Sequence, residues 1–400
     1  MKSVLQTTEF LLPKDGTDMS AWAVVACDQF TSEAEYWEKL KEYVGGRPSA
    51  LELILPEIYL SQRGAEEKVA AAMRRYLKDG VFKKTEKGLI LTVRSTPYVG
   101  RRIGLVGAVD LEEYDYSPNS SALIRATEAT IEERIPPRMK IRKNAPAEFS
   151  HIMLLYDDAS RSLNEKLYER RAEFEKIYDF DLNMDGGHVE GYFIRDCEGI
   201  LSAFEQLGSA AGDFLFAAGD GNHSLATAKE HWNELKKDLG EEKRKTHPAR
   251  YCLAEIVNLY DDGIYFEPIY RYVSGVDKAA FADRIFRTDG NFILYDGKAL
   301  KGKKNAKGLP ESIAEVDAAV KEYIAAHGGK VDYVHGLEHL KSLVESNSDS
   351  VGILFDALEK KDLFSWVAKN GSLPRKTFSM GEGVEKRYYL EGKLITDGDI

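Results

Sequence analysis

A short glycine-containing turn carries the clearest chemical signal in the sequence. An apolar run at residues 214–218 leads into Gly219-Asp220-Gly221-Asn222-His223-Ser224, and apolar residues then recur at helical spacing through residue 235. Glycine lets a backbone come close to a ligand, and the first N–H groups of a helix have no acceptor within the helix. Together with the helix dipole, these donors favour an anion such as phosphate or carboxylate. The expected phosphate contacts in the turn are Gly219, Gly221, Asn222 and Ser224.

The polar side chains of this turn allow two interpretations. In the first, Asp220 holds a divalent metal ion and His223 accepts a proton. In the second, Asp220 or Asn222 caps the helix, as these residue types often do, and His223 has no chemical role. Two standard phosphate motifs do not fit, because G-x-x-x-x-G-K-[ST] is absent and G-x-G-x-x-G would need glycine at Ser224.

A second candidate segment covers residues 123–143. Five cations fall between Arg134 and Lys143 in a chain whose net charge is negative. Guanidinium groups bind phosphate through paired hydrogen bonds, so the segment is suited to an anionic ligand. Its candidate phosphate contacts are Arg125, Arg138 and Lys140, and Glu128 is a candidate base or Mg²⁺ ligand. A loop with solvated charges is the simpler alternative.

A third segment, residues 372–387, combines cations, hydroxyl groups and glycine in close succession. Arg375 and Lys376 are its candidate phosphate contacts, and a glycine-rich loop between strands is the alternative. Asp28-Gln29, which follows the first apolar strand, is a weaker candidate, and a structural role is the simpler reading there.

The pattern of apolar residues predicts several domains of mixed α/β class. We expect an N-terminal α+β domain at residues 1–150, with antiparallel strands near residues 89–93 and 103–109. From residue 151 strands and helices alternate, which is typical of a partly parallel sheet with crossover helices. We therefore expect a central α/β domain at 151–275 that carries the turn, with a helix from residue 162 through 177. An α+β region should follow at 276–400.

Length and composition restrict the class of protein. The chain has 400 residues, 43% of them hydrophobic, and a formal net charge of −11, so we expect a multi-domain globular protein and neither nucleic acid nor an anionic membrane as a general partner. No apolar stretch approaches the ~20 residues that cross a bilayer, and the N-terminus lacks a signal-peptide pattern. The three cysteines are far apart, which argues against a disulfide framework. A cytoplasmic location is therefore expected.

The chain resembles the domain-of-unknown-function 1015 family over nearly its whole length. The similarity takes in residues 26–32, 53–57, 123–146, 219–224 and 373–390. More remotely, the turn is similar to the Asp-Gly-His-His-Arg signature of ParB-like and sulfiredoxin-like folds, which include nucleotide-binding partition proteins and a kinase of free serine. That resemblance implies a ParB-like phosphate-binding turn in which Asp220 and His223 match the Asp and the second His. Asn222 and Ser224 depart from the signature at the first His and at the Arg, so cations from elsewhere would have to replace that Arg.

These observations lead to one main functional hypothesis and two alternatives. The main one is a Mg²⁺-dependent phosphotransferase, a small-molecule kinase that uses ATP or ADP, with Asp220 holding Mg²⁺ and Glu128 or His223 taking the acceptor proton. The cations Arg138, Lys140, Arg375 or Lys376 would neutralise the developing charge. A non-catalytic protein that binds a nucleotide or phosphorylated metabolite would need the anion site without the base. A phosphoester hydrolase would release phosphate without an acceptor. The acceptor, the nucleotide and the oligomeric state stay open.

Overall fold

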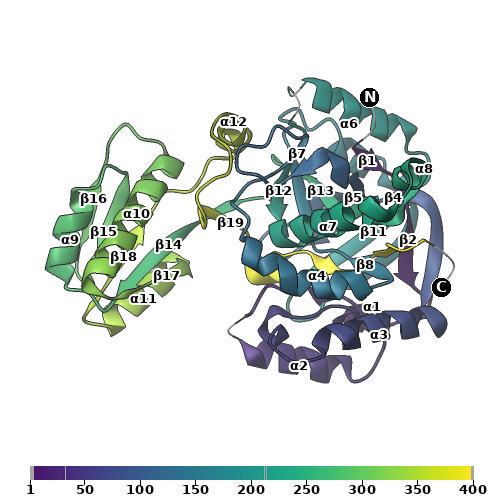
Figure 1. Ribbon diagram of the computed structural model, residues 1–400, viewed down its shortest axis with the longest axis horizontal. Helices are drawn as coiled ribbons and strands as arrows, with labels where there is room; N and C mark the ends of the chain where they lie inside the picture. The colour runs from purple at the N-terminus through teal and green to yellow at the C-terminus, as the bar shows by residue number, and fades with distance from the viewer. Residues whose placement is uncertain (1–3, 32, 211, 213, 398–400) are drawn as a thin grey trace. The chain divides into compact units, whose positions relative to one another are not determined.

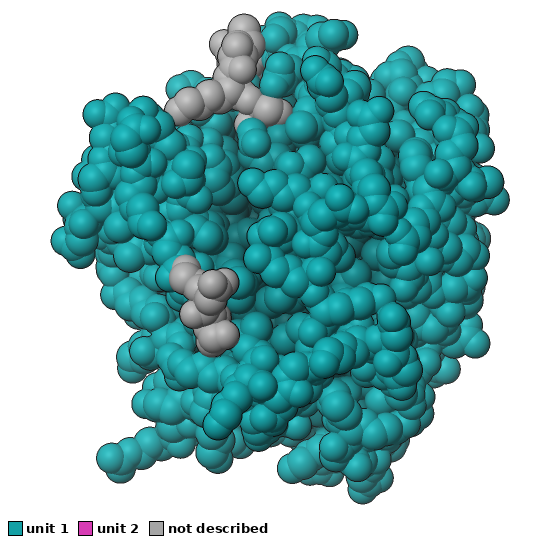
Figure 2. Space-filling view, turned by 90° about the vertical axis from the view of Figure 1, so that its right-hand side faces the viewer, with its two compact units in different colours: residues 1–264, 382–400 teal, residues 265–381 magenta. Residues whose placement is uncertain are grey.

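The computed structural model describes residues 4–31, 33–210, 212 and 214–397 (Figure 1). The chain divides into two compact units: unit 1 comprises residues 1–264 and 382–400, and unit 2 comprises residues 265–381. Figure 2 shows one face of unit 1 in space-filling form. These boundaries differ from the three regions expected from the sequence, because strands from both sides of residue 150 share one sheet and the last strands of the chain return to it.

Unit 1 contains the turn and most of the helices discussed below. Its elements in the first 150 residues are β1 (Leu5–Gln6), β2 (Thr8–Pro13), α1 (Met19–Trp22), β3 (Val24–Val25), α2 (Ala34–Val44), α3 (Ala65–Lys78), β4 (Phe82–Ser95), β5 (Arg102–Asp110), β6 (Tyr114–Asp115), β7 (Ile124–Ala126), α4 (Ile135–Asn144) and β8 (Ala147–Phe149). The remaining ones are β9 (Met153–Tyr156), α5 (Asn164–Glu169), β10 (Glu175–Asp181), β11 (His188–Ile194), α6 (Glu198–Ala210), β12 (Phe216–Asp220), α7 (Asn222–Leu235), α8 (Glu241–Thr246), β13 (Tyr251–Asn258), β20 (Tyr388–Tyr389) and β21 (Gly392–Leu394).

Within the described residues, a 13-stranded sheet forms the centre of unit 1. Its main path is β6-β7-β12-β9-β13-β5-β4-β2-β21-β8; β1 pairs with β5, β11 with β4, and β10 with β11. The pairs β6–β7, β7–β12 and β9–β13 are parallel, and the other pairs are antiparallel. The structure therefore confirms the mixed α/β class with a partly parallel sheet. It also confirms the antiparallel pair of strands, since Ile90 lies opposite Val106.

One predicted helix is shorter than expected. The helix expected to run through residue 177 ends at Glu169, and residues 175–181 form β10 instead. Tyr178 is buried and Phe180 partly buried within β10, which pairs with residues 188–193 of β11. Aromatic residues fit a pleated surface well, so the hairpin with β11, which pairs on its other edge with β4, prevails over the helical spacing of the apolar residues.

Unit 2 is built from one continuous stretch of the chain. Its elements are β14 (Phe266–Ser274), α9 (Lys278–Phe286), β15 (Phe292–Tyr295), β16 (Leu300–Lys303), α10 (Leu309–His327), β17 (Lys330–His335), α11 (Leu337–Ser346), β18 (Ser350–Leu354), α12 (Lys360–Asn370) and β19 (Phe378–Met380). Five of its strands pair in the order β16-β15-β18-β14-β17, and β19 also pairs with β14. Among the helices of both units in the described ranges, none is long and apolar enough to cross a bilayer.

The last segment of the chain returns to unit 1 and is held there by buried arginines. Arg94 and Arg102 donate hydrogen bonds to the backbone carbonyl of Glu385, at 3.0 and 2.9 Å. Arg387 pairs with Glu255 at 2.6 Å and also donates to the carbonyl of Ser150 at 3.1 Å. Strand β20 then pairs with β3, and β21 lies between β2 and β8. The positions of residues 384–391 in unit 1 are thus fixed by many polar contacts.

Candidate phosphate-binding site

The predicted turn lies where β12 ends and α7 begins. Strand β12 lies between β7 and β9, and Phe216, Ala217 and Ala218 are fully buried. Gly221 has a φ of +74°, and a Cβ atom there would lie 3.0 Å from the Cα atom of Ile152. Both facts explain why glycine occupies this position.

Helix α7 begins without a side-chain cap among the described residues. Gly221 is the N-cap residue, and Asp220 Oδ1 accepts a hydrogen bond from the Gly221 N–H at 2.9 Å, outside the helix. The alternative in which Asp220 or Asn222 caps the helix is therefore not what the structure has. The first turn of α7 keeps the donor character that an anion site needs.

Asp220 is paired with a lysine from the last segment of the chain. Lys386 Nζ lies 3.4 Å from Asp220 Oδ2, and the two side chains are only 10% and 16% exposed. Within the described residues, Oδ2 accepts no hydrogen bond. Lys386 belongs to the third sequence segment, but it was not among the residues selected from that segment. The cation that pairs with the turn is thus Lys386, ten residues after the predicted Lys376.

Asp28 lies close to the same lysine and to a buried histidine. Its Oδ2 is 3.8 Å from His151 Nε2, and His151 Nδ1 is 2.6 Å from the hydroxyl group of Tyr389. Burial favours a raised pKa for the Asp28 carboxyl, but His151, a hydrogen bond from Gln29 and Lys386 outweigh it and hold the pKa below its ordinary value. Asp28 is 29% exposed, so it is an ionised carboxylate that a ligand can reach.

The second sequence segment runs alongside the turn. Thr127 donates a hydrogen bond to the carbonyl of Ala218 at 2.7 Å, and the Ile131 N–H donates to His223 Nε2 at 3.2 Å. His223 therefore joins the two segments, and its Nε2 lone pair is already occupied by this hydrogen bond. Glu128 lies between these two contacts and is half-buried.

The side chain of Arg125 contacts residues next to strand β7. It lies in β7 opposite Ala217, its Nε donates to the carbonyl of Ala122 at 2.8 Å, and its guanidinium lies 4.5 Å from the ring centre of Phe214. The side chain is buried, with 8% exposed.

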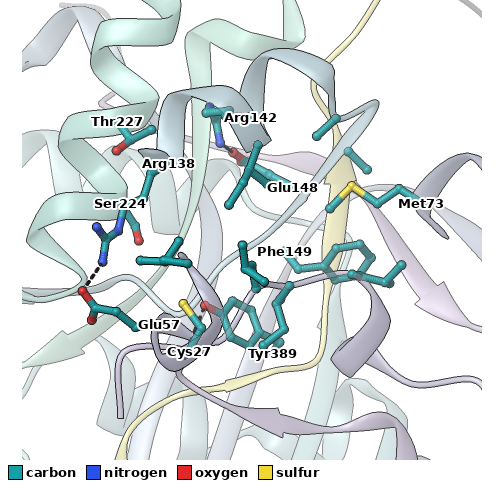
Figure 3. A pocket seen from close by; sticks show the side chains of 17 residues that line it. Cys27, Glu57, Met73, Arg138, Arg142, Glu148, Phe149, Ser224, Thr227 and Tyr389 are labelled. Carbon is teal, nitrogen blue, oxygen red and sulfur yellow. Dashed lines mark hydrogen bonds and ion pairs between the residues drawn. The ribbon is translucent and has the colours of Figure 1, made fainter. Parts of the chain in front are cut away.

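A cavity of about 130 Å³ is lined by residues of both α7 and α4 (Figure 3). Ser224 and Thr227 from α7 and Arg138 and Arg142 from α4 contribute its polar lining. Glu57, Glu148, Cys27 and Tyr389 are also part of the lining, with apolar side chains from residues 53–60. Burial, with Asp28 adding to it, raises the pKa of the Cys27 thiol to about 12, so this thiol is protonated near neutral pH and is a poor nucleophile.

Helical spacing determines which cations of α4 reach the cavity. Residues 138 and 142 are four apart and share one face, whereas Lys140 is exposed and does not line the cavity. Arg138 pairs with Glu57 at 2.9 Å, and Arg142 pairs with Glu148 at 2.5 Å. The Nε and Nη2 atoms of Arg142 are buried and have no hydrogen-bond partner among the described residues.

A buried network continues beneath the cavity. Glu148 is 3.8 Å from Lys393 Nζ and accepts a hydrogen bond from the Leu253 N–H at 2.7 Å. Burial would raise the pKa of Glu148, but Arg142 and Lys393 hold it below its ordinary value. Burial, with the charge of Arg142, lowers the pKa of His231 to about 4. Arg142 and Glu148 of the cavity lining are thus joined to a second buried cation, Lys393, and lie near a neutral imidazole, that of His231.

Arg375 and Lys376 belong to unit 2. Their backbone carbonyls accept hydrogen bonds from Arg271 at 3.3 and 2.9 Å, and Arg271 is itself fully buried and pairs with Asp317 at 2.8 Å. The structure thus gives the main chain at Arg375 and Lys376 a role inside unit 2. Their expected contact with phosphate stays a prediction.

Comparison with known proteins places the sequence in a family and finds distant structural neighbours. The family described as "Protein of unknown function (DUF1015)" matches residues 11–345. No curated protein matches the chain. A conserved hypothetical protein from Pyrococcus furiosus is 12% identical, with a TM-score of 0.36 over 72% of this chain and 94% of that one. A free serine kinase in complex with AMP is 10% identical, with a TM-score of 0.40 over 72% and 90%. SbnI with a C-terminal truncation, from Staphylococcus aureus, is 8% identical, with a TM-score of 0.34 over 69% and 82%.

Proposed function

The chain belongs to the DUF1015 family of proteins of unknown function, and from its site we propose that it is a Mg²⁺-dependent phosphotransferase that transfers the terminal phosphoryl group of ATP or ADP to a small hydroxyl compound. The observation that carries the proposal is the cavity in which Ser224 and Thr227 of α7 lie with Arg138 and Arg142 of α4. A helix start and two guanidinium groups that converge on one cavity are the arrangement that binds phosphoryl oxygens.

The size of the cavity supports binding of phosphoryl groups rather than of a whole nucleotide. Its volume of about 130 Å³ is well below the roughly 300–1,000 Å³ of pockets that enclose complete small-molecule ligands. In the proposed complex the phosphates therefore enter the cavity and the nucleoside lies outside it. The unpartnered Nε and Nη2 of Arg142 are donors that a phosphoryl oxygen would satisfy.

The carboxylates next to the turn fit a Mg²⁺ ion. Asp220 Oδ2 is buried and accepts no hydrogen bond from the described residues, and carboxylate oxygens are ligands that Mg²⁺ prefers. Bound there by Asp220, the ion would neutralise phosphate charge. Lys386, which pairs with Asp220 at 3.4 Å, would then turn toward the phosphoryl oxygens.

Asp28 is our candidate for the general base. Its depressed pKa keeps it ionised near neutral pH, and it is exposed enough to meet an acceptor. In the proposed step the acceptor O–H gives its proton to Asp28 while the acceptor oxygen bonds to the terminal phosphorus. The P–O bond to the nucleotide breaks, and the shortened nucleotide leaves with the bonding electrons. Glu128 stays the alternative base, whereas His223 Nε2 is already an acceptor for the Ile131 N–H.

The binding test compares two cations of the same helix. Melting temperatures are measured with ATP or ADP and Mg²⁺ for the unmodified protein, Arg138→Ala and Lys140→Ala. Ligand at 100 times its Kd stabilises the folded protein by about 2.7 kcal/mol. We expect Arg138→Ala to weaken binding by about 1.5–3 kcal/mol, the worth of a charged hydrogen bond, and Lys140→Ala to bind normally. The proposal fails if no nucleotide stabilises the protein, or if both substitutions act equally.

The turnover test uses Asp28→Asn, with the exposed Asp79→Asn as the control. Loss of phosphoryl transfer with retained nucleotide binding in Asp28→Asn, and normal transfer in Asp79→Asn, is the expected result. Phosphate release without an acceptor would favour the phosphoester hydrolase.

A second candidate function is a non-catalytic protein that binds a phosphorylated metabolite. The small cavity and the ion pair Arg138–Glu57 in its lining favour this candidate, because a phosphate group could bind Arg138 in place of Glu57 without any base. Binding that survives Asp28→Asn, in a protein with no turnover of any tested acceptor, would identify it.

A further inference from the structure

Unit 1 has a second, larger cavity, a groove between α2, α3 and residues 51–62. Its volume is about 870 Å³, which falls within the range of roughly 300–1,000 Å³ for pockets that hold small molecules. Ile54 and Leu55 line both this groove and the phosphate-binding cavity, but Arg138, Arg142, Ser224 and Thr227 line only the latter. The inference below therefore does not rest on the proposed function.

The floor and walls of this groove are mainly apolar. Trp37 and Val44 from α2 and Val69 and Ala72 from α3 are buried side chains in its lining. The segment between the helices adds further apolar side chains, which are Leu51, Ile54, Leu55, Pro56 and Tyr59. Uptake of an aliphatic chain by this lining is favourable, because the apolar surface of the chain and of the partly exposed Leu51, Leu55 and Tyr59 is removed from water.

The charged residues that line the groove carry a net positive charge. Glu52 is paired with Arg75, so their charges cancel. Lys41 and Lys68 are exposed, and no carboxylate of the groove lining is left to balance them. In a chain whose formal net charge is −11, two exposed lysines in a lining that has no further carboxylate favour an anionic group on the ligand.

We propose that this groove binds a small amphipathic anion: a molecule with an aliphatic body and one carboxylate group. The aliphatic body lies against the partly exposed Leu51, Leu55 and Tyr59, and the carboxylate lies near Lys41 and Lys68. Burial of each methylene group strengthens binding by about fourfold. The ligand's chain length and its charge should therefore both determine its affinity.

The test is calorimetric titration of the full-length protein with dodecanoate below its micelle concentration. Decanoate, which is two methylene groups shorter, should bind about fifteenfold more weakly. The cation dodecyltrimethylammonium should bind far more weakly than dodecanoate, because Lys41 and Lys68 repel it. No binding of dodecanoate, or equal binding of the cation, would overturn the proposal.

Two variants locate the ligand in the groove. Lys41→Glu with Lys68→Glu should weaken dodecanoate binding by about tenfold, and the same change at Lys39 and Lys78, on the same helices but outside the lining, should leave it unchanged. Ala71→Trp places an indole in the groove from an exposed position and should abolish binding. Equal binding by every variant would overturn the proposal, and so would binding of an acidic amphipathic peptide in place of dodecanoate.

Discussion

Removal of Lys386 tests whether its ion pair with Asp220 organises the turn. The charges are 3.4 Å apart, which corresponds to an attraction of about 5 kcal/mol at an effective dielectric constant of 20. With both side chains less than a fifth exposed, removal of one partner leaves a largely buried, uncompensated charge. We expect Lys386→Met to lower the free energy of unfolding by about 3 kcal/mol.

A double-mutant cycle separates the pair from the rest of each side chain. Asp220→Asn alone removes one carboxylate from beside Lys386, which stays close to Asp28, whereas the double variant removes both charges of the pair. We therefore expect the double variant to be more stable than the sum of the single effects predicts, by about 2 kcal/mol. Urea unfolding at neutral pH measures all four proteins. Effects that add within about 0.5 kcal/mol would refute the reasoning.

The control is a lysine–carboxylate pair at a shorter distance but a more exposed position. Lys236 Nζ lies 3.0 Å from Glu112 Oε1, with side chains 28% and 35% exposed. If burial decides the energy, Lys236→Met should cost at most about 1 kcal/mol. If distance decided it, this control would cost more than Lys386→Met, and the argument from burial would be wrong.

Three further predictions concern the residues around the cavity. His231 has a pKa of about 4 in the folded protein, so on acidification this imidazole binds a proton at a higher pH in the unfolded chain than in the folded protein. The free energy of unfolding is therefore unaffected by His231 above about pH 6.5 and falls by up to about 3 kcal/mol toward pH 4. His231→Gln should remove that part of the slope, and an unchanged acid transition would contradict the burial of the imidazole. Glu148→Gln leaves Arg142 and Lys393 without a carboxylate and should destabilise the protein by about 3–5 kcal/mol in urea; a cost under about 1 kcal/mol would mean that the network is open to water. Gly221→Ala should cost about 1–3 kcal/mol in thermal unfolding, because of its φ of +74° and the contact with Ile152, and a neutral effect would show that the turn relaxes.

Local patterns were sufficient to predict the turn and its helix. Leu225, Ala228 and Trp232 repeat at helical spacing and are all fully buried, and the glycine at 221 has the positive φ that its residue type indicates. Both features depend on neighbours in the sequence, which is why they can be read without the fold.

The cations were harder to assign because their secondary structure was not recognised. The sequence indicated a loop at residues 134–143, where the structure has α4 with proline in its first turn. Proline is tolerated there because the first N–H groups of a helix lack partners in any case. Only on a helix do Arg138 and Arg142 share a face that excludes Lys140.

Asp28, His151 and Lys386 show what sequence alone could not supply. Their proximity depends on the pairing of β20 with β3, in which Tyr388 lies opposite Val25, and on the arginines that hold the carbonyl of Glu385. No local pattern encodes a pairing over so many residues.

The return of the chain to unit 1 has a consequence for synthesis on the ribosome. Unit 2 is one continuous stretch, residues 265–381, and its strands are complete when that stretch has emerged. The sheet of unit 1 is incomplete until β21 has been synthesised, because β21 pairs with both β2 and β8. Until those last residues arrive, the edges of β2 and β8 lack the strand that joins them and are open to mispairing. A nascent chain that stalls within unit 2 would therefore be a client for chaperones.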